Sequence, residues 1–375
     1  YLSLCTPDTP ESVKRSASEY SKAHIWIPWH EARKGSIPFY FDLASNLVRD
    51  SLPYALSKYR SKAFRAKVDE LDAGGKFDLI VCDFLVPSVN LFPRANSLVT
   101  PVTLFQHNVE ALIWRRMTDN AQGLPQSYLR LQWERMRQAE QSLARQFDSV
   151  IGVSDEDCEM MRADYGLSNV LGSVPTGVDV EYYQPSSTPR KPRSIAFLGS
   201  MDWQPNIDGI RWFHAEVWPS LKKQMPDISL KIIGRRPVDF IKQLAAGDPA
   251  IEVTGTVDDV RPHLSQVQAM VVPLRVGGGT RIKIYESMAM GIPVVSTRIG
   301  AEGLSVTDGE NILLADEPDA MRDGIVHLLD SNAMQESIGG KGRKLVCDHF
   351  SWQAVTSVFE QHCFATRYLR KKETP

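Results

Sequence analysis

The sequence predicts an α/β protein with two doubly wound domains, and three observations lead to this prediction. Short apolar runs rich in branched residues alternate with longer amphipathic stretches, the pattern of a parallel sheet covered by helices. The chain has 375 residues, more than one hydrophobic core normally serves. The segment QPSSTPRKPR at 184–193 is dense in proline, serine and charge, so few contacts should cross it. We therefore expect a first domain over 1–186, a second over 190–350 and a C-terminal helix over 351–375.

The order of the elements follows from the same alternation. Branched apolar runs predict strands at 77–84, 101–106, 149–154, 169–175, 194–199, 227–234, 250–255, 268–274, 292–297 and 310–315. Amphipathic stretches predict helices over 126–147 and 205–224, and the opening residues YLSLC have the character of a strand already under way. Ligands of such sheets bind at the carboxyl ends of the strands, so we expect a ligand cleft between the two domains. The C-terminal helix should pack back across both domains.

Composition excludes several classes of protein. Acidic and basic residues nearly cancel, leaving a formal charge of −2, which argues against a protein built mainly to bind nucleic acid. Five scattered cysteines without metal-finger spacing argue against a disulfide framework and fit a reducing cytoplasm. No apolar run reaches the roughly 18 residues of a membrane helix. A peripheral contact at the inner face of a membrane would have to use charged and aromatic side chains.

Three consecutive glycines, Gly277, Gly278 and Gly279, follow a predicted strand and precede a helix that we expect to begin near Thr280. Bare backbone lets a phosphate approach, and the free N–H groups and dipole of a helix N-terminus favour its charge. Neither the Walker pattern nor the dinucleotide pattern GxGxxG is met. Taken alone, the glycines fit a flexible loop before a surface helix equally well.

Two cationic residues and one carboxylate follow these glycines. Arg281 and Lys283 would add cationic partners for a phosphate. Glu286 shares a helix face with Lys283, and its carboxylate can accept hydrogen bonds from two adjacent hydroxyls, as on a ribose. The alternative reading of Glu286 is a surface pair with Lys283, worth a few tenths of a kcal/mol. For Arg281 and Lys283 the alternative is a solvated position on the helix.

The stretch GGGTRIKIYESMAMGIPVVSTRIGAEGL, which begins at Gly277, resembles the donor-binding signature of family 4 retaining glycosyltransferases. Further segments resemble the family in order and spacing from Phe77 onward: VSDEDCEMM, PTGVDVEYYQP, FLGSMDWQPNIDGIRWF and VTGTVDDVRPHLSQVQAMVVPL. The resemblance implies two Rossmann-like domains facing each other across a cleft, the GT-B architecture. It also implies transfer of a sugar from a nucleotide-diphosphate donor to a saccharide or lipid-linked acceptor, with retention of anomeric configuration.

The resemblance assigns a role to each matching residue. The backbone amides of Thr280, Arg281 and Ile282 would face the donor diphosphate, Glu286 would hold the ribose, and Val257 would lie along the nucleobase. The donor-binding residues that it implies are Gly199, Asn206, Val257, Gly277, Gly278, Gly279, Thr280, Ile282, Lys283 and Glu286. The catalytic residues that it implies are His107 and Arg281.

The chain departs from the family pattern at two places in the second domain. The first glutamate of the family's paired motif falls on Gly278, so another group must contact the donor sugar. The turn that begins at Gly199 lacks the family's basic pair, although Gly199 permits close approach and Asn206 can donate a hydrogen bond. Arg281 and Lys283 are therefore expected to neutralise more of the negative charge of the diphosphate.

Two features of the first domain bear on catalysis. His107 ends a predicted strand, where the resemblance implies contact with the donor sugar, although a lone histidine is more often structural. Asp155, Glu156 and Asp157 spell the Asp-x-Asp of metal-dependent transferases. They follow Ser154 at an expected helix start, where capping explains them better. We therefore expect no cofactor and no required metal.

The first domain is expected to bind the acceptor, and it matches the family least. Candidate contacts with a saccharide or lipid-linked acceptor are Trp26, Trp29, Arg33, Lys34, Trp114, Arg115 and Arg116. The strand, glycine-rich loop and helix that open the family do not precede YLSLC, so the first βα unit is expected to be missing. Two alternatives stay open: a truncated, non-catalytic sugar-nucleotide-binding homologue, and a nucleotide-sugar epimerase on the same architecture.

Overall fold

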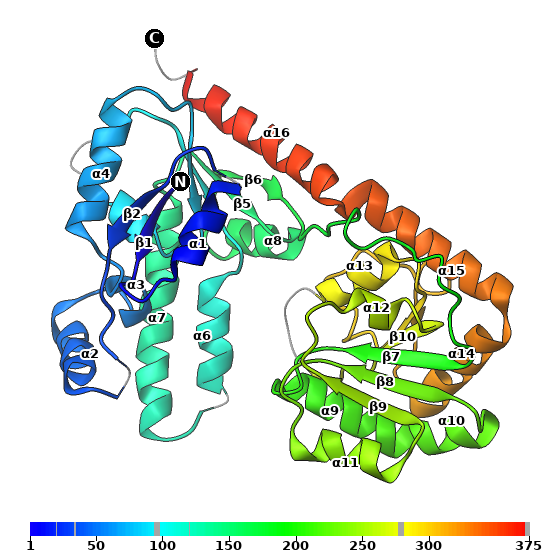
Figure 1. The fold of residues 1–375 in the computed structure, drawn as a ribbon. Coiled ribbons are helices and arrows are strands. Elements are labelled where there is room, and N and C mark those ends of the chain that lie inside the picture. The colour runs from blue at the N-terminus through cyan, green and yellow to red at the C-terminus, as the bar shows by residue number, and fades with distance from the viewer. Residues whose placement is uncertain (20, 34, 94–97, 120, 277–280, 372–375) are drawn as a thin grey trace. The chain divides into compact units, whose positions relative to one another are not determined.

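The structure is a computed structural model that describes residues 1–371 except 20, 34, 94–97, 120 and 277–280 (Figure 1). The chain forms two compact units, Tyr1–Val174 together with the segment from Val358 onward, and Pro175–Ser357. The units divide earlier than the proline-rich segment at 184–193. The reason is that Val178 lies beside Ser351: its N–H donates to the Phe350 carbonyl over 2.7 Å, which ties this stretch to unit 2.

The strands described in unit 1 form two parallel sheets. β1 (Leu2–Cys5) pairs with β2 (Ile25–Pro28), and the second sheet has the order β3 (Ile80–Asp83), β4 (Val102–Phe105), β5 (Ser149–Gly152), β6 (Val170–Ser173). β4 and β5 are almost fully buried, which explains their continuous apolar sequence. The predicted strands of this domain are confirmed, and β1 coincides with the strand-like opening YLSLC.

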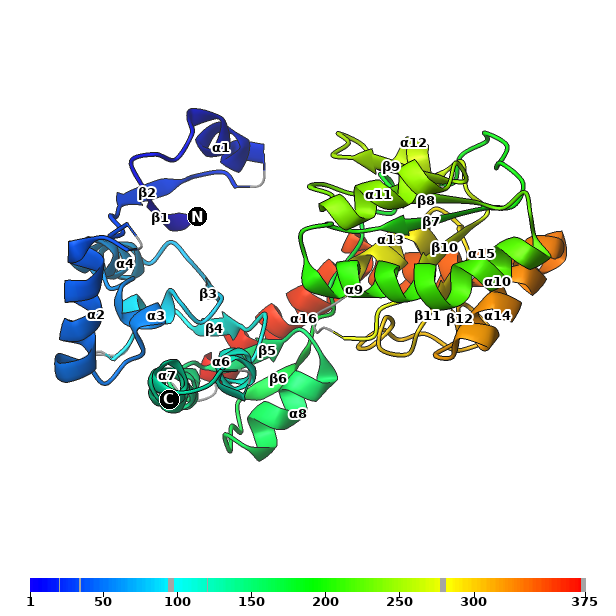
Figure 2. The same cartoon turned by 90° about the horizontal axis from the view of Figure 1, so that it is seen from below.

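Helices cover the sheets of unit 1 (Figure 2). Their bounds are α1 (Glu11–Ser16), the 3-10 turn η1 (Ala17–Glu19), α2 (Ile37–Arg49), α3 (Tyr54–Ser57), α4 (Lys62–Ala73), α5 (Ser88–Leu91), α6 (Glu110–Asp119), α7 (Leu124–Ala144) and α8 (Asp155–Ala163). Ser36 and Ser61 cap α2 and α4, each accepting a hydrogen bond from the backbone N–H three residues on. The predicted helix over 126–147 corresponds to α7.

The sheet of unit 2 has six parallel strands in the order β9-β8-β7-β10-β11-β12. Their bounds are β7 (Ser194–Leu198), β8 (Ser229–Ile233), β9 (Ile251–Gly255), β10 (Ala269–Val272), β11 (Val294–Ser296) and β12 (Leu313–Leu314). This is the 3-2-1-4-5-6 order of a doubly wound sheet, in which the strand order reverses between β7 and β10. Ligands of such sheets bind at the carboxyl ends of the strands near this reversal.

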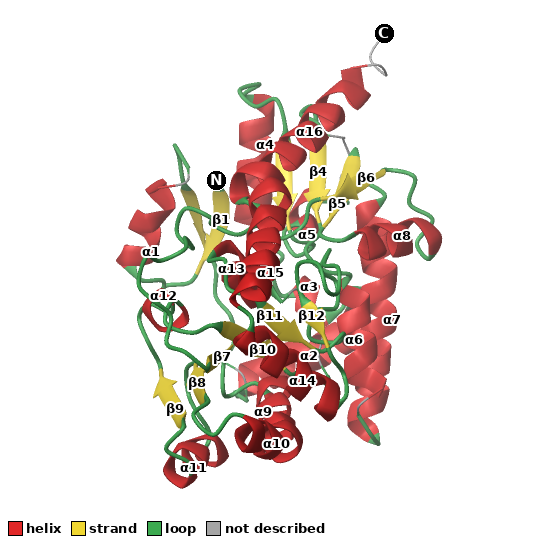
Figure 3. Cartoon of the chain, turned by 90° about the vertical axis from the view of Figure 1, so that its right-hand side faces the viewer, coloured by secondary structure: helices red, strands yellow, loops and turns green. Residues whose placement is uncertain are grey.

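Helices cover both faces of the unit 2 sheet, with α9 and α10 on one face and α13 and α15 on the other (Figures 1 and 3). The helices are α9 (Gln204–Trp212), the π-helical segment η2 (Phe213–Val217), α10 (Trp218–Gln224), α11 (Asp239–Gly247), α12 (Arg261–Leu264), α13 (Ile282–Ala289), α14 (Pro318–Asp330), α15 (Asn332–Leu345) and the π-helical segment η3 (Val346–Phe350). The predicted helix over 205–224 is confirmed as the continuous run α9-η2-α10.

The C-terminal segment is helical, as expected: α16 (Trp352–Lys371). It begins in unit 2 and continues in unit 1. In unit 1, Thr366 Oγ1 lies 2.6 Å from Ser149 Oγ, and Phe359 packs against Phe105. Among the described residues, no helix combines the length and apolarity that crossing a bilayer requires.

Candidate donor site

A cavity of about 360 Å³ lies in unit 2, where the carboxyl ends of β7, β8 and β9 meet the first turns of α13. Four of the donor-binding residues inferred from the sequence line it together: Gly199, Val257, Lys283 and Glu286. The other lining residues are Tyr183, Leu198, Ser200, Gly234, Arg235, Thr256 and Val260. The position agrees with the rule for doubly wound sheets, because β7 borders the strand-order reversal.

Two glycines let neighbouring backbone segments approach closely at the floor of this cavity. A Cβ on Gly234, just after β8, would overlap the carbonyl oxygen of Gly199, just after β7. A Cβ on Gly199 would lie 2.6 Å from Nδ2 of Asn206. The position of Gly234 therefore requires glycine, because its clash is with backbone, whereas a side chain at Gly199 would displace the Asn206 amide. The close approach leaves the carboxyl ends of β7 and β8 free of side-chain bulk.

Asn206 and Lys283 form a polar bridge beside these glycines. Asn206, in the first turn of α9, donates from Nδ2 to the Ser200 carbonyl over 2.8 Å. Lys283 Nζ donates to Asn206 Oδ1 over 3.1 Å and lies 4.5 Å from the centroid of the Phe197 ring. Burial, and secondarily the charge of Arg281, lower the pKa of Lys283 to about 7. An anion entering the cavity would find this amino group already oriented and would favour its protonated form.

Glu286 lies one turn further along α13 and is half-buried. Burial raises the pKa of its carboxyl, whereas a hydrogen bond from Tyr183 and the charge of Lys283 oppose this shift. Burial and the neighbouring Glu286 carboxyl raise the pKa of Tyr183, so its hydroxyl stays a donor. The Glu286 carboxylate therefore lies at the cavity wall, and the alternative reading of a solvated surface pair with Lys283 does not apply.

Arg235 is a residue of this site that the sequence interpretation missed. It follows Gly234 directly, lines the cavity and donates from Nε to Ser200 Oγ over 2.9 Å. The sequence interpretation found no positive charge in the turn after β7, and the next strand along the sheet supplies it instead. The signal in the sequence was the basic pair RR immediately after a predicted strand, because carboxyl ends of adjacent parallel strands share one edge of the sheet.

Of the residues from the glycine run to the start of α13, the structure describes Arg281 and Ile282, and these two differ in their exposure to solvent. Gly277, Gly278, Gly279 and Thr280 lie outside the described residues. Arg281 is 5% exposed, and its guanidinium carbon lies 5.6 Å from the centroid of the Trp203 ring; it is not among the residues that line the cavity. Ile282 is the first residue of α13 and is 37% exposed.

The helix was expected to begin near Thr280, and in the described residues it begins at Ile282. Arg281 is the N-cap of α13 and has φ −85° and ψ 61°, outside the helical region, so the helix begins at Ile282. Lys283 and Glu286 nevertheless share the helix face that lines the cavity, because their spacing of three residues is unchanged.

His107 lies in unit 1, just beyond the carboxyl end of β4. Its Nε2 is hydrogen-bonded to Asp83 Oδ1 over 2.7 Å, at the end of the neighbouring strand β3. The ring stacks on Phe84 with a centroid distance of 3.9 Å. These contacts hold the imidazole in one orientation at the edge of the sheet where ligands of parallel sheets bind.

A buried carboxylate supports the loop that carries His107. Glu140, on α7, is 1% exposed and lies beneath the N-terminus of α6. It accepts hydrogen bonds from Nε2 of Gln106, the backbone N–H groups of Glu110 and Ala111, and the hydroxyl of Tyr165. Four donors converging on one buried carboxylate fix this loop in place.

The acidic triplet Asp155–Asp157 occupies the first turn of α8. Ser154 is the N-cap of α8 and accepts a hydrogen bond from the Asp157 N–H over 3.1 Å. Asp155 Oδ1 accepts a hydrogen bond from Ser173 Oγ over 2.6 Å. The capping interpretation of the triplet is therefore confirmed.

Two family models match the chain. The model Glycosyltransferase Family 4 matches residues 5–182, and the model Glycosyl transferases group 1 matches residues 192–331. The likeness in the first half thus begins well before Phe77, where the sequence motifs had placed its start.

Curated relatives match at low identity. An uncharacterized 44.6 kDa protein in the cps region of Klebsiella pneumoniae is 19% identical over 80% of this chain and 77% of its own. A phosphatidyl-myo-inositol mannosyltransferase of Mycolicibacterium smegmatis is 27% identical over 49% of each chain. A GDP-mannose-dependent monoacylated alpha-(1-6)-phosphatidylinositol monomannoside mannosyltransferase of Corynebacterium glutamicum is 24% identical over 58% of this chain and 62% of its own.

Solved structures share the fold. The Anabaena protein HepE, solved in complex with UDP, superposes with a TM-score of 0.62 at 13% identity, over 96% of this chain and 98% of its own. Sucrose-phosphate synthase from Thermosynechococcus elongatus gives a TM-score of 0.61 at 18% identity, over 90% of this chain and 82% of its own. The two family models, which together match most of the chain, show that it belongs to the family 4 glycosyltransferases, and the solved structures share its two Rossmann-like domains in the GT-B architecture.

Proposed function

We propose that the protein transfers a sugar from a nucleotide-diphosphate donor to a saccharide or lipid-linked acceptor, with retention of anomeric configuration. The observation that carries the proposal is the cavity of unit 2, where two cations, a carboxylate and two closely packed glycines meet at the carboxyl ends of three parallel strands. The family membership supports it, as do a GDP-mannose-dependent relative and a UDP-bound structural neighbour.

The cavity divides into regions that suit the parts of such a donor. Arg235 and Lys283 are the cations that line it, next to the bare backbone at Gly199, and this region suits a diphosphate. Glu286, oriented by Tyr183, suits the two adjacent hydroxyls of a ribose. Beyond Gly255, the backbone and apolar side chains of the next loop, including Val257, offer a surface for a nucleobase.

The chemistry follows from where charge develops. Breaking the bond between the anomeric carbon and the diphosphate leaves negative charge on the departing phosphate. Cations aimed there stabilise the transition state more than the ground state. In a retaining reaction of this kind, the leaving phosphate accepts the acceptor's proton on the same face. His107 is proposed to orient the donor sugar and Arg281 to stabilise the departing diphosphate. The proposal includes no metal ion.

A peripheral contact with a lipid surface is part of the proposal. Ile37, Phe41, Ala44 and Val48 recur along one face of α2 at helical spacing, and we call them the apolar stripe. All four side chains are exposed to solvent, and the exposed fraction is 86% for Ile37, 69% for Phe41 and 86% for Val48. Amphipathic helices with such stripes lie in membrane interfaces. Two relatives are named for phosphatidylinositol-based acceptors.

The test begins with binding. Isothermal titration of the full chain with UDP and with GDP should show binding of at least one nucleotide, and Glu286→Ala should weaken it. Asp239→Asn is the matched control, because Asp239 lies on α11 outside the cavity and its side chain is 88% exposed. Binding of neither nucleotide would overturn the proposal.

The reaction is tested on UDP-glucose and GDP-mannose with a panel of saccharide and lipid-linked acceptors. Anomeric proton NMR should show a new glycoside with the donor's configuration. An isomerised donor would favour an epimerase, an inverted product would refute retention, and binding without any turnover would favour a non-catalytic homologue.

A further inference from the structure

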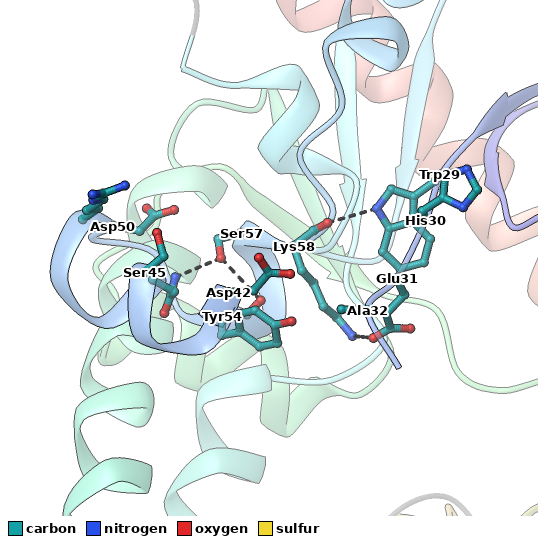
Figure 4. A pocket seen from close by; sticks show the side chains of 12 residues that line it. Trp29, His30, Glu31, Ala32, Asp42, Ser45, Asp50, Tyr54, Ser57 and Lys58 are labelled. Carbon is teal, nitrogen blue, oxygen red and sulfur yellow. Dashed lines mark hydrogen bonds and ion pairs between the residues drawn. The ribbon is translucent and has the colours of Figure 1, made fainter. Parts of the chain in front are cut away.

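A second cavity, of about 280 Å³, lies entirely within unit 1, beyond the carboxyl end of β2 (Figure 4). Trp29 and Glu31 follow β2 and form one wall. Asp42 and Arg49 lie on one face of α2, and Tyr54 and Lys58 come from α3 and the residue after it. Trp29 was among the acceptor candidates inferred from the sequence, and the structure gives it these polar neighbours.

Hydrogen bonds and ring stacking hold the walls of this cavity in place. The indole N–H of Trp29 donates to the Lys58 carbonyl over 3.0 Å, and its ring stacks on Tyr59 with a centroid distance of 4.8 Å. Asn46 Nδ2 donates to the Leu52 carbonyl over 3.0 Å and to Ser57 Oγ over 2.9 Å, which ties α2 to α3. A cavity with fixed walls loses little conformational entropy when a ligand enters.

The charges around the cavity are mostly committed to one another. Lys58 pairs with Glu31, and Asp50 pairs with Arg60 over 2.6 Å. Asp42 and Arg49 remain, and within the described part of the chain neither has a hydrogen bond or an ion pair from its side chain. The cavity therefore offers one open carboxylate and one open guanidinium, whose charges cancel, beside aromatic side chains that include Trp29 and His30.

We propose that this cavity binds one uncharged sugar residue of the acceptor, an inference that rests on the proposed glycosyltransferase function. Sugar hydroxyls both donate and accept, so they satisfy the Asp42 carboxylate and the Arg49 guanidinium at once. The apolar face of a sugar ring can pack on the Trp29 indole. A phosphate would meet three lining carboxylates, those of Glu31, Asp42 and Asp50, against two lining cations, those of Arg49 and Lys58.

The size and polarity of the cavity narrow the range of possible ligands further. The volume lies just below the usual range for ligand pockets, about 300–1,000 Å³, which suits one ring rather than an oligosaccharide. A hydrocarbon chain in this place would strip water from Asp42 and Arg49 without offering a partner. The Tyr54 hydroxyl stays protonated as a further donor, because burial, and secondarily the charge of Asp42, raise its pKa.

The experiment measures binding of methyl α-mannoside, methyl α-glucoside and N-acetylglucosamine to the full chain by saturation-transfer NMR. At least one should bind, and Asp42→Asn should weaken it by about fivefold or more, since a hydrogen bond to a charged group is lost. Glu134→Gln, which changes an exposed carboxylate on α7 outside the cavity, should leave the affinity unchanged. Trp29→Ala should also reduce binding, with folding checked by thermal unfolding.

Nucleotide titrations on the same samples separate the two proposals. If UDP or GDP binds but no glycoside does, or if Asp42→Asn binds glycosides as well as the unchanged chain, the sugar cavity is refuted while the donor site stands. If inorganic phosphate displaces the glycoside at low millimolar concentration, the ligand class is wrong. If glycosides bind and no nucleotide does, the proposed transfer function fails and the sugar site stands as a binding site alone.

Discussion

Lys283 Nζ donates to Asn206 Oδ1 over 3.1 Å, and this contact joins α13 to α9. α9 follows β7 and α13 follows β10, the two strands between which the order of the sheet reverses. The bridge therefore spans the position where doubly wound sheets bind their ligands. It places a partly desolvated ammonium there before any donor arrives.

Donor affinity should depend on pH through Lys283. Its pKa is lowered to about 7 in the free protein, and a bound diphosphate would raise it again. Between these two values the complex holds one more proton than the free protein. Affinity should therefore be flat below pH 7 and fall by up to about tenfold per unit above it, until the pKa of the complex is reached.

This dependence is measured by titrating UDP-glucose and GDP-mannose between pH 6 and pH 9 in buffers of different ionisation enthalpy. The diphosphate diester does not ionise in this window, and the ring N–H of uracil or guanine begins to do so only near pH 9, so proton uptake at lower pH reports the protein. In Lys283→Met the slope above pH 7 should disappear. A slope that persists in this variant would assign the titration to another group.

Gly234→Ala should destabilise unit 2 by about 2 kcal/mol or more and abolish nucleotide binding, because the new Cβ would overlap the Gly199 carbonyl. Gly247→Ala is the matched control, since a Cβ there meets nothing within 4 Å. It should be neutral or slightly stabilising. Denaturant unfolding measures both; equal stability of the two variants would show that the close approach of β7 and β8 is not required.

Glu286→Ala should weaken UDP or GDP binding by about 10- to 100-fold if its carboxylate holds the ribose hydroxyls. The sharper measurement compares each nucleotide with its 2′-deoxy form. In the unchanged protein the deoxy form should bind more weakly, and in Glu286→Ala this difference should vanish. An undiminished difference in the variant would place the ribose contact on another residue.

The apolar stripe of α2 should bind lipid. Replacing Ile37 and Phe41 together by serine should reduce co-sedimentation with vesicles of mixed phosphatidylcholine and phosphatidylglycerol by about tenfold or more, because buried apolar area drives such binding. Val13→Ser, which removes an exposed apolar side chain from α1, should change little. Sedimentation that is equal for all three proteins would remove the membrane contact from the proposal.

The sequence predicted the elements of unit 2 well, because they depend on local patterns. Every predicted strand after Ser194 is present, and Lys283 and Glu286 lie on one cavity face, since helical spacing alone brings them together. Arg235 was missed for the opposite reason. It lies 48 residues before Lys283 in the chain, and only the pairing of β7 with β8 brings it to the same site.

Unit 1 was predicted less completely. β2 and the short helices around the second cavity gave no strong periodic signal, and the pocket depends on contacts such as that between Trp29 and Lys58, which are 29 residues apart. The first residue of α13 could be predicted only approximately, because the backbone of Arg281 leaves the helical region and no residue-type preference indicates this.

Helix α2 carries Asp42 and Arg49 toward the second cavity on one side and the apolar stripe on another. If both surfaces act as proposed, helix α2 sets the distance between the bilayer and the sugar ring bound in the second cavity. An acceptor would then be chosen as much by how far its headgroup projects from the lipid as by its stereochemistry. Synthetic glycolipids with spacers of increasing length would measure this distance between the bilayer and the bound sugar.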